Sequence, residues 1–325
     1  MRTHILLILT LLLTSGLIAA QEQSPYDIAL ERIEEARISG ATDLNLSGLG
    51  LETLPLELFQ LDSLTELNVA GNQLTRLPTE IGQLNNLTRL EVSVNRLTSL
   101  PAEIGQLSGL TELNIAFNQL THLPAEIGRL SNLTELNVAV NELTRLPAEI
   151  GQLSNLSELL VEINRLTQLP IEIGQLNNLT VLSVGVNQLT SIPAEISQLS
   201  NLTELSASGN QLTNLPAEIG QLSKLCGLVL SDNGFRHMPM ELADLASMTR
   251  DGCWIVVDGN PLITPPEDVI AQGTPAILDY LRNQAAMRAQ QITLAIASMV
   301  GLVAAFLRAF RWRTRRLGRK KKREN

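Results

Sequence analysis

Residues 64–86 read LTELNVAGNQLTRLPTEIGQLNN, and residues 133–155 read LTELNVAVNELTRLPAEIGQLSN, the same pattern three periods of 23 residues further along. One asparagine recurs at this period: Asn72, Asn95, Asn118, Asn141, Asn164, Asn187, Asn210 and Asn233. Counting outward gives nine regular repeats from Ala41 to Ser247 and a tenth, four residues longer, that ends at Asn260-Pro261. A period of roughly 20–50 residues is typical of units that stack on one another, so the sequence predicts a solenoid.

Each repeat combines a strand-like segment with a return segment. In residues 64–86, ELNV alternates polar and apolar residues, as a half-buried strand does, and TEIGQL after Pro78 has the pattern of a helical or 3₁₀ turn. Stacked repeats bury their Leu and Ile side chains against one another, at ~1.5–3 kcal/mol for each. We therefore predict an α/β solenoid, in which a curved parallel sheet lines the concave face and 3₁₀ or helical arms form the convex face.

The asparagine column has a structural explanation. A side-chain amide that faces inward at this point satisfies backbone groups where the chain leaves the strand. The column therefore predicts a structural ladder and not a binding site.

The pattern LxxLxLxxNxLxxLPxEIGxLxx is that of a leucine-rich repeat of the 23-residue kind, and it resembles the arrays of Ras-group scaffold proteins and of bacterial Roco-type proteins. ALERIEEARISGATDLNLSGLGLETLP (29–55) is similar to the N-terminal flank of Roco arrays, and GNPLITPPEDVIAQGTPAILDYLR (259–282) to the segment that leads into their GTPase domain. A charge-free segment stands here where the GTPase would begin. The resemblance therefore implies a recognition role for the array, without GTPase activity.

The flanks of the array predict a leader and two caps. Residues 1–20 have a basic start, an apolar run and a small-residue end, the pattern of a signal peptide that is cut after Ala20 or kept as a signal anchor. Residues 21–40 predict an N-terminal capping helix, residues 41–264 the ten-repeat solenoid, and residues 265–288 a C-terminal cap or linker. Caps are expected because an open solenoid end exposes its apolar core.

Residues 289–307 contain no charged side chain, and residues 308–325 contain ten basic ones. A span of about 20 apolar residues with a basic flank predicts a transmembrane helix and a cytoplasmic tail. This predicts a single-pass protein of the cell membrane, with extracytoplasmic repeats and with anionic inner-leaflet lipid at the tail. The alternative is a buried or surface amphipathic helix with a nucleic-acid-binding tail.

The charge balance argues against nucleic acid as a partner of the array. The chain has 24 basic and 33 acidic residues, and residues 21–307 hold 13 and 32 of them, a net charge of −19. Such a surface repels nucleic acid. The sequence has no GxxxxGK[ST] loop, and its histidines, His4, His122 and His237, stand too far apart to converge. We therefore expect no enzyme activity, no cofactor and no metal.

The two cysteines occupy equivalent positions in neighbouring repeats. Cys226 is the second residue of the ninth repeat and Cys253 the second residue of the tenth. Neighbouring parallel strands lie about 5 Å apart, which is within the Cα range of a disulfide. An exported compartment would favour oxidation. We predict a Cys226–Cys253 disulfide, with two free thiols as the alternative.

Two columns predict a binding surface on the concave side or its rim. The third strand position reads Asp43, Glu66, Arg89, Glu112, Glu135, Glu158, Val181 and Glu204, and Glu112, Glu135 and Glu158 form its continuous acidic part. The residue before the asparagine is apolar in five consecutive repeats: Val94, Phe117, Val140, Ile163 and Val186. At ~4.8 Å per strand these five would form a row on the order of 20 Å long. Exposed apolar patches often mark protein interfaces, although drift among tolerated apolar residues would also produce the row.

We therefore predict a membrane-anchored protein that presents a protein-binding concave surface outside the cytoplasm, with a basic protein as ligand. Two alternatives remain open at this stage. One is a structural envelope or surface protein without a dedicated ligand, and the other is an intracellular scaffold for small GTPases.

Overall fold

The computed structural model describes residues 23–321, so the predicted signal peptide lies outside the described residues. Its ten strands form one parallel sheet in chain order, one strand for each predicted repeat. The strands are β1 (Asp43–Asn45), β2 (Glu66–Asn68), β3 (Arg89–Glu91), β4 (Glu112–Asn114), β5 (Glu135–Asn137), β6 (Glu158–Leu160), β7 (Val181–Ser183), β8 (Glu204–Ser206), β9 (Gly227–Val229) and β10 (Trp254–Val256).

Short 3₁₀ helices form the return arms. They are η1 (Leu56–Gln60), η2 (Thr79–Gln83), η3 (Ala102–Gln106), η4 (Ala125–Arg129), η5 (Ala148–Gln152), η6 (Ile171–Gln175), η7 (Ala194–Gln198), η8 (Ala217–Gln221), η9 (Met240–Asp244) and η10 (Ala246–Thr249). A proline precedes each of η1 to η9, because its fixed φ suits the start of a helical turn and its missing N–H would have no partner there. The predicted sheet and 3₁₀ arms are confirmed.

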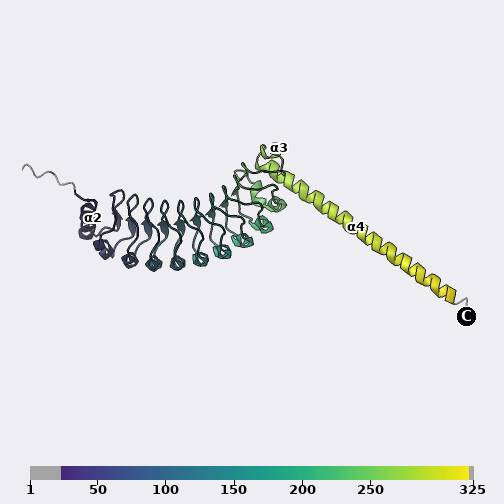
Figure 1. Cartoon of the computed structure of the whole chain (residues 1–325), viewed down its shortest axis with the longest axis horizontal. Coiled ribbons are helices and arrows are strands. Elements are labelled where there is room, and N and C mark those ends of the chain that lie inside the picture. The colour runs from purple at the N-terminus through teal and green to yellow at the C-terminus, as the bar shows by residue number, and fades with distance from the viewer. Residues whose placement is uncertain (1–22, 322–325) are drawn as a thin grey trace, which may run out of the picture.

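The core runs through the whole array as one continuous cluster. Each repeat contributes the same inward positions, and in the fifth repeat these are Leu136, Val138, Leu143, Leu146, Ile150 and Leu153. Figure 1 shows the repeats side by side as a curved array, with the 3₁₀ turns along its lower edge. No repeat could bury this surface alone, so the stacking of neighbours stabilises all of them.

The asparagine column forms the predicted ladder. Asn141 Oδ1 accepts the N–H of Leu120 at 3.0 Å, and Nδ2 donates to the carbonyls of Ile115 and Val138 at 3.1 and 3.0 Å. Each asparagine thereby ties its own repeat to the preceding one. The side chain is almost fully buried and is not available to a ligand.

Helix α2 (Pro25–Ser39) covers the first repeat. The Ser24 hydroxyl accepts the N–H of Asp27 at 3.2 Å, and Gly40 ends the helix in the left-handed conformation with φ 66°. These are the usual N-terminal and C-terminal caps of a helix. Ala29, Ile33 and Ala36 are buried in the common core.

At the other end, α3 (Glu267–Ile270) and α4 (Thr274–Lys321) follow the last repeat. The start of α4 buries Ile277, Leu278 and Leu281, and the rest of the helix projects away from the array (Figure 1). Helix α4 is continuous across residues 288 and 307, where the sequence predicted a cap, a span and a tail.

Within the described residues, no helix is both long and apolar enough to cross a membrane. The structure therefore does not support the transmembrane helix predicted at residues 289–307. The side chains of residues 304–321 and all of residues 322–325 lie outside the described set, and these contain the predicted basic tail.

The predicted disulfide is confirmed. Cys226 and Cys253 are bonded, with their Cα atoms 4.6 Å apart. Cys226 immediately precedes β9 and Cys253 immediately precedes β10, and these two strands pair in parallel. Helix η10 spans the junction of the ninth and tenth repeats and lies between the two cysteines in the chain.

Candidate functional site

The five apolar residues before the asparagines, here called the apolar ridge, share an unusual backbone conformation. Their φ angles are 55° at Val94, 56° at Phe117, 55° at Val140, 55° at Ile163 and 51° at Val186. These values lie in the left-handed region, which costs about 1–2 kcal/mol for a residue with a side chain and is a clear outlier for a β-branched residue. The ridge therefore places side chains where the backbone disfavours them.

Each of the five remaining repeats has a residue that suits this conformation. The same slot holds Gly48, Gly71, Gly209, Asp232 and Gly259, all with positive φ. Glycine adopts this region without steric cost, and Asp tolerates it better than Val or Ile does. The fold therefore requires a left-handed residue in all ten repeats, and only the five central repeats meet that requirement with bulky apolar side chains.

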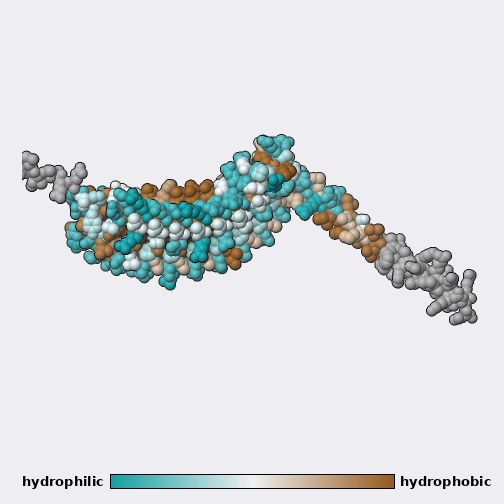
Figure 2. Space-filling view, in the orientation of Figure 1, coloured by the Kyte–Doolittle hydropathy of each residue, from teal (hydrophilic) through white to brown (hydrophobic). Residues whose placement is uncertain are grey.

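The ridge is held in register by hydrogen bonds between repeats. The N–H of Phe117 donates to the carbonyl of Ala139, and the N–H of Val140 donates to that of Glu162, each at 2.9 Å. Phe117 and Ile163 are 56% and 47% exposed, whereas Val140 is half-buried. Figure 2 shows a row of hydrophobic surface along the upper edge of the central repeats, away from the 3₁₀ turns. The predicted row therefore lies on the surface, and four of its five side chains are exposed.

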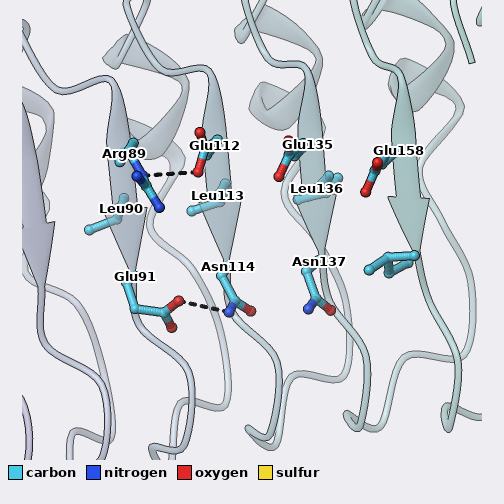
Figure 3. A pocket seen from close by; sticks show the side chains of 11 residues that line it. Arg89, Leu90, Glu91, Glu112, Leu113, Asn114, Glu135, Leu136, Asn137 and Glu158 are labelled. Carbon is cyan, nitrogen blue, oxygen red and sulfur yellow. Dashed lines mark hydrogen bonds and ion pairs between the residues drawn. The ribbon is translucent and has the colours of Figure 1, made fainter.

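The acidic column follows the sheet register. Arg89 is opposite Glu112, Glu112 is opposite Glu135, and Glu135 is opposite Glu158. Figure 3 shows these side chains in a row on adjacent strands. The structure thus brings together the three predicted glutamates, and it places Arg89 at one end of them and Val181 at the other.

The charges within this column are unequal. Arg89 Nε lies 2.9 Å from Glu112 Oε2, which forms an ion pair. The pKa of Glu135 is raised, and the largest cause is the reduced hydration of its carboxyl on the concave face. The neighbouring carboxylates of Glu112 and Glu158 raise it further, whereas Arg89 lowers it. Arg89 therefore balances the negative charge of Glu112, whereas Glu135 and Glu158 have no ion-pair partner among the described residues.

A second row lies beside the acidic column, two residues further along each strand, at the fifth position of the repeat. Glu91 Oε2 accepts a hydrogen bond from Asn114 Nδ2 at 2.7 Å (Figure 3). Asn137 Oδ1 accepts the N–H of Ala139 at 3.0 Å. In the sixth repeat Leu160 replaces the polar residue. The two rows line a shallow depression of about 240 Å³ on the concave face.

One polar group close to the ridge was not found from the sequence. Among the described residues, Glu162 Oε2 is the buried side-chain polar atom that lacks a hydrogen-bond partner. Glu162 directly precedes Ile163 of the ridge. The positive φ of the ridge was also missed, although the glycines in the same column of the flanking repeats are its sequence signal.

The described residues show no metal-binding cluster. They contain no group of three or more His, Cys, Asp or Glu side chains that could hold a metal ion. His122 Nδ1 lies 3.1 Å from Thr121 Oγ1, and His237 Nδ1 lies 2.8 Å from Thr264 Oγ1, in separate repeats. The absence of enzyme activity remains a prediction.

Comparison with known proteins identifies the class of the chain. A family described as a leucine-rich repeat region matches residues 43–142, and a second leucine-rich repeat family matches residues 154–212. The chain is a leucine-rich repeat protein. The resemblance to Ras-group scaffold and Roco-type arrays is not confirmed by these matches, and no curated relative matches the chain.

Solved structures share the fold. A leucine-rich repeat protein of Leptospira interrogans is 37% identical with a TM-score of 0.65, over 74% of this chain and 66% of that one. The ectodomain of the Arabidopsis thaliana membrane receptor kinase GASSHO1/SCHENGEN3, solved with CASPARIAN STRIP INTEGRITY FACTOR 2, is 33% identical with a TM-score of 0.60, over 68% and 27%. The Arabidopsis receptor kinase HAESA, solved with the peptide hormone IDA and the co-receptor SERK1, is 28% identical with a TM-score of 0.59, over 69% and 39%.

The lengths differ more than the folds do. The chain spans 66% of the Leptospira protein and less than half of each of the two plant chains. The similarity therefore concerns the repeat array and not the whole of those proteins.

Proposed function

We propose that the array binds a protein or peptide, and that the apolar ridge and the adjacent concave face form the contact surface. The observation that carries the proposal is the left-handed conformation of a bulky apolar residue in each of five consecutive repeats. Strained backbone persists where the surrounding structure enforces it, and it is concentrated at functional sites.

The conformational cost argues against neutral drift as the origin of the ridge. Random replacement would favour glycine or Asp in this slot, as the flanking repeats show at Gly71, Gly209 and Asp232. The central repeats instead have Val, Phe or Ile, and most of these side chains are exposed to solvent. An exposed apolar row that lowers stability is explained when a partner covers it.

The similar plant ectodomains support a binding role. GASSHO1/SCHENGEN3 was solved in complex with CASPARIAN STRIP INTEGRITY FACTOR 2 and HAESA in complex with the peptide hormone IDA, and both receptors share the solenoid fold with this chain. Repeat arrays present extended concave surfaces for such contacts. A spacer without a ligand would need no ridge.

The experiment selects binders of the full chain from a displayed library of random peptides. Phe117→Asp with Ile163→Asp should reduce capture of the enriched peptides to background, because the central apolar contacts are lost. Leu56→Asp with Ile171→Asp is the matched control, because these residues are equally exposed but lie on the convex 3₁₀ turns. Urea unfolding of both double variants checks that the array remains folded.

Equal capture by the ridge variant and the control variant would reject this surface. A ridge variant that unfolds early would be replaced by Phe117→Gly with Ile163→Gly, which remove the same side chains and suit the backbone.

We also propose that the array operates in an exported, oxidising compartment. The Cys226–Cys253 disulfide supports this location, because disulfides persist mainly outside the reducing cytosol. Alkylation of the protein immediately after lysis of its native cells, under denaturing and non-reducing conditions, tests the proposal. Two blocked thiols would place the array in a reducing compartment.

A further inference from the structure

We infer that the segment bound on this surface is basic as well as apolar. Its apolar side chains rest on the apolar ridge, while its Lys or Arg side chains lie over the carboxylates of Glu135 and Glu158. The occupant is a segment of another protein that runs along the array and crosses the strands. The inference rests on the proposed function, since it names the chemistry of the partner at the same surface.

The first argument is the unbalanced charge of the concave face. Glu112 has an ion-pair partner in Arg89, but no described cation lies within ion-pair distance of Glu135 or Glu158. Loss of hydration and, to a smaller extent, the neighbouring carboxylates of Glu112 and Glu158 raise the pKa of Glu135, which disfavours its ionised form. A cation from a partner would stabilise that ionised form, whereas an acidic partner would be repelled.

The second argument is the parallel course of the two rows. Both follow the sheet register, and the acidic column Glu112–Glu158 lies alongside the three central repeats of the ridge. Within one repeat, Glu135 and Val140 are five residues apart, at most about 16 Å at ~3.3 Å per residue. A bound segment is about 10 Å wide when its side chains are included. A segment that lies between the acidic column and the apolar ridge therefore contacts both rows.

The depression lies where such a segment would lie. Its floor includes Asn114, Asn137 and Leu160 of the fifth strand position, between the acidic column and the ridge. Leu160 provides an apolar surface for the stem of a Lys or Arg side chain, beside the carboxylate of Glu158.

The test uses peptides enriched on the full chain from the random library and measures their affinity for paired variants. Glu135→Gln with Glu158→Gln should weaken binding about tenfold, as expected for the loss of two partly exposed ion pairs. Glu149→Gln with Glu172→Gln removes the same net charge from the convex turns η5 and η6 and should change affinity less than about twofold. The enriched peptides should contain an excess of Lys and Arg alongside apolar residues.

The possible results separate this inference from the proposed function. Neutral or acidic peptides that still require Phe117 and Ile163 would overturn the basic partner and leave the binding surface intact. Equal losses for the concave and the convex pair would also overturn it, because the attraction would then be a general effect of net charge. Peptides that ignore the ridge altogether would reject the proposed function as well.

Discussion

At the scale of single residues, this array combines a uniform backbone with a non-uniform choice of side chains. The slot before the asparagine has a left-handed backbone from Gly48 in the first repeat to Gly259 in the tenth. The inter-repeat hydrogen bonds impose this conformation, whatever residue occupies the slot. The residue type in this slot therefore reflects a balance between stability, which favours glycine, and the proposed binding, which favours an apolar side chain.

That balance predicts opposite effects on stability and binding. Val94→Gly and Ile163→Gly should each raise the free energy of unfolding by about 1 kcal/mol, because glycine relieves the left-handed strain at the cost of some chain entropy. The same changes should weaken capture of peptides by the ridge. Urea unfolding and peptide affinity, measured on the same preparations, check both effects.

The control for this prediction is Ile171→Gly, which removes an exposed apolar side chain from η6, where φ is not positive. This variant should gain no stability. If Ile163→Gly lowered stability as much as Ile171→Gly, strain at the ridge would not explain the choice of residues.

The acidic column predicts a dependence of stability on pH. Because the pKa of Glu135 is raised in the folded state, ionisation of this carboxyl lowers stability. The loss is absent at acid pH, where folded and unfolded forms are both protonated, and it is complete above the raised pKa. Glu135→Gln should therefore stabilise the array at neutral pH and give no gain in acid, as urea midpoints across the pH range would show.

An NMR titration of the Glu135 carboxyl gives a second measurement of the same effect. Glu158→Gln removes a neighbouring carboxylate and should bring the pKa of Glu135 back toward its ordinary value. A titration unchanged by Glu158→Gln would contradict the account of the column.

At the scale of secondary-structure elements, the 3₁₀ turns stack too closely for most side chains in one slot. A Cβ atom at Gly151 in η5 would lie 2.6 Å from the carbonyl oxygen of Glu172 in η6. Similar contacts occur at Gly128 and Gly174. This close approach explains why the pattern has glycine after the isoleucine of most turns.

Gly151→Ala should therefore lower the free energy of unfolding by about 1–3 kcal/mol, as overpacking usually does. Ser197→Ala in η7 is the matched variant, because this turn already has a side chain in the same slot, with its hydroxyl bonded to the Ala194 carbonyl. Chemical unfolding of both variants checks the prediction. A Gly151→Ala protein as stable as Ser197→Ala would show that the turns can separate without cost.

At the scale of the whole molecule, stability depends on contacts between neighbouring repeats, so an end can open without the centre. The Cys226–Cys253 disulfide closes the last repeat across a separation of 27 residues. A loop of this length predicts a stabilisation of about 3–4 kcal/mol by restricting the unfolded chain. The bond therefore acts at the end of the array from which α4 projects.

Cys226→Ser with Cys253→Ser should accordingly loosen one end and leave the centre unchanged. Amide hydrogen exchange should become faster in β9 and β10 but not in β5. The reduced wild-type protein should behave like the double variant, which separates loss of the bond from any effect of serine. Uniformly faster exchange along the array would show that the repeats unfold as one unit.

The sequence by itself determined the architecture, because a fixed period converts spacing along the chain into spacing in the structure. The asparagines at intervals of 23 residues, the strand positions of Glu112, Glu135 and Glu158, and the adjacency of Cys226 and Cys253 all follow from that period. Each depends on stacking equivalent positions, and the apolar pattern of every repeat specifies this stacking.

The tertiary structure decided what the period leaves open. Val and Ile alone would favour an extended backbone, but the hydrogen bonds of the adjacent repeats hold Val140 and Ile163 in the left-handed region. The pairing of Arg89 with Glu112, rather than with another acid, likewise depends on rotamers and on sheet curvature. These features belong to contacts between repeats, and for that reason no single repeat of the sequence reveals them.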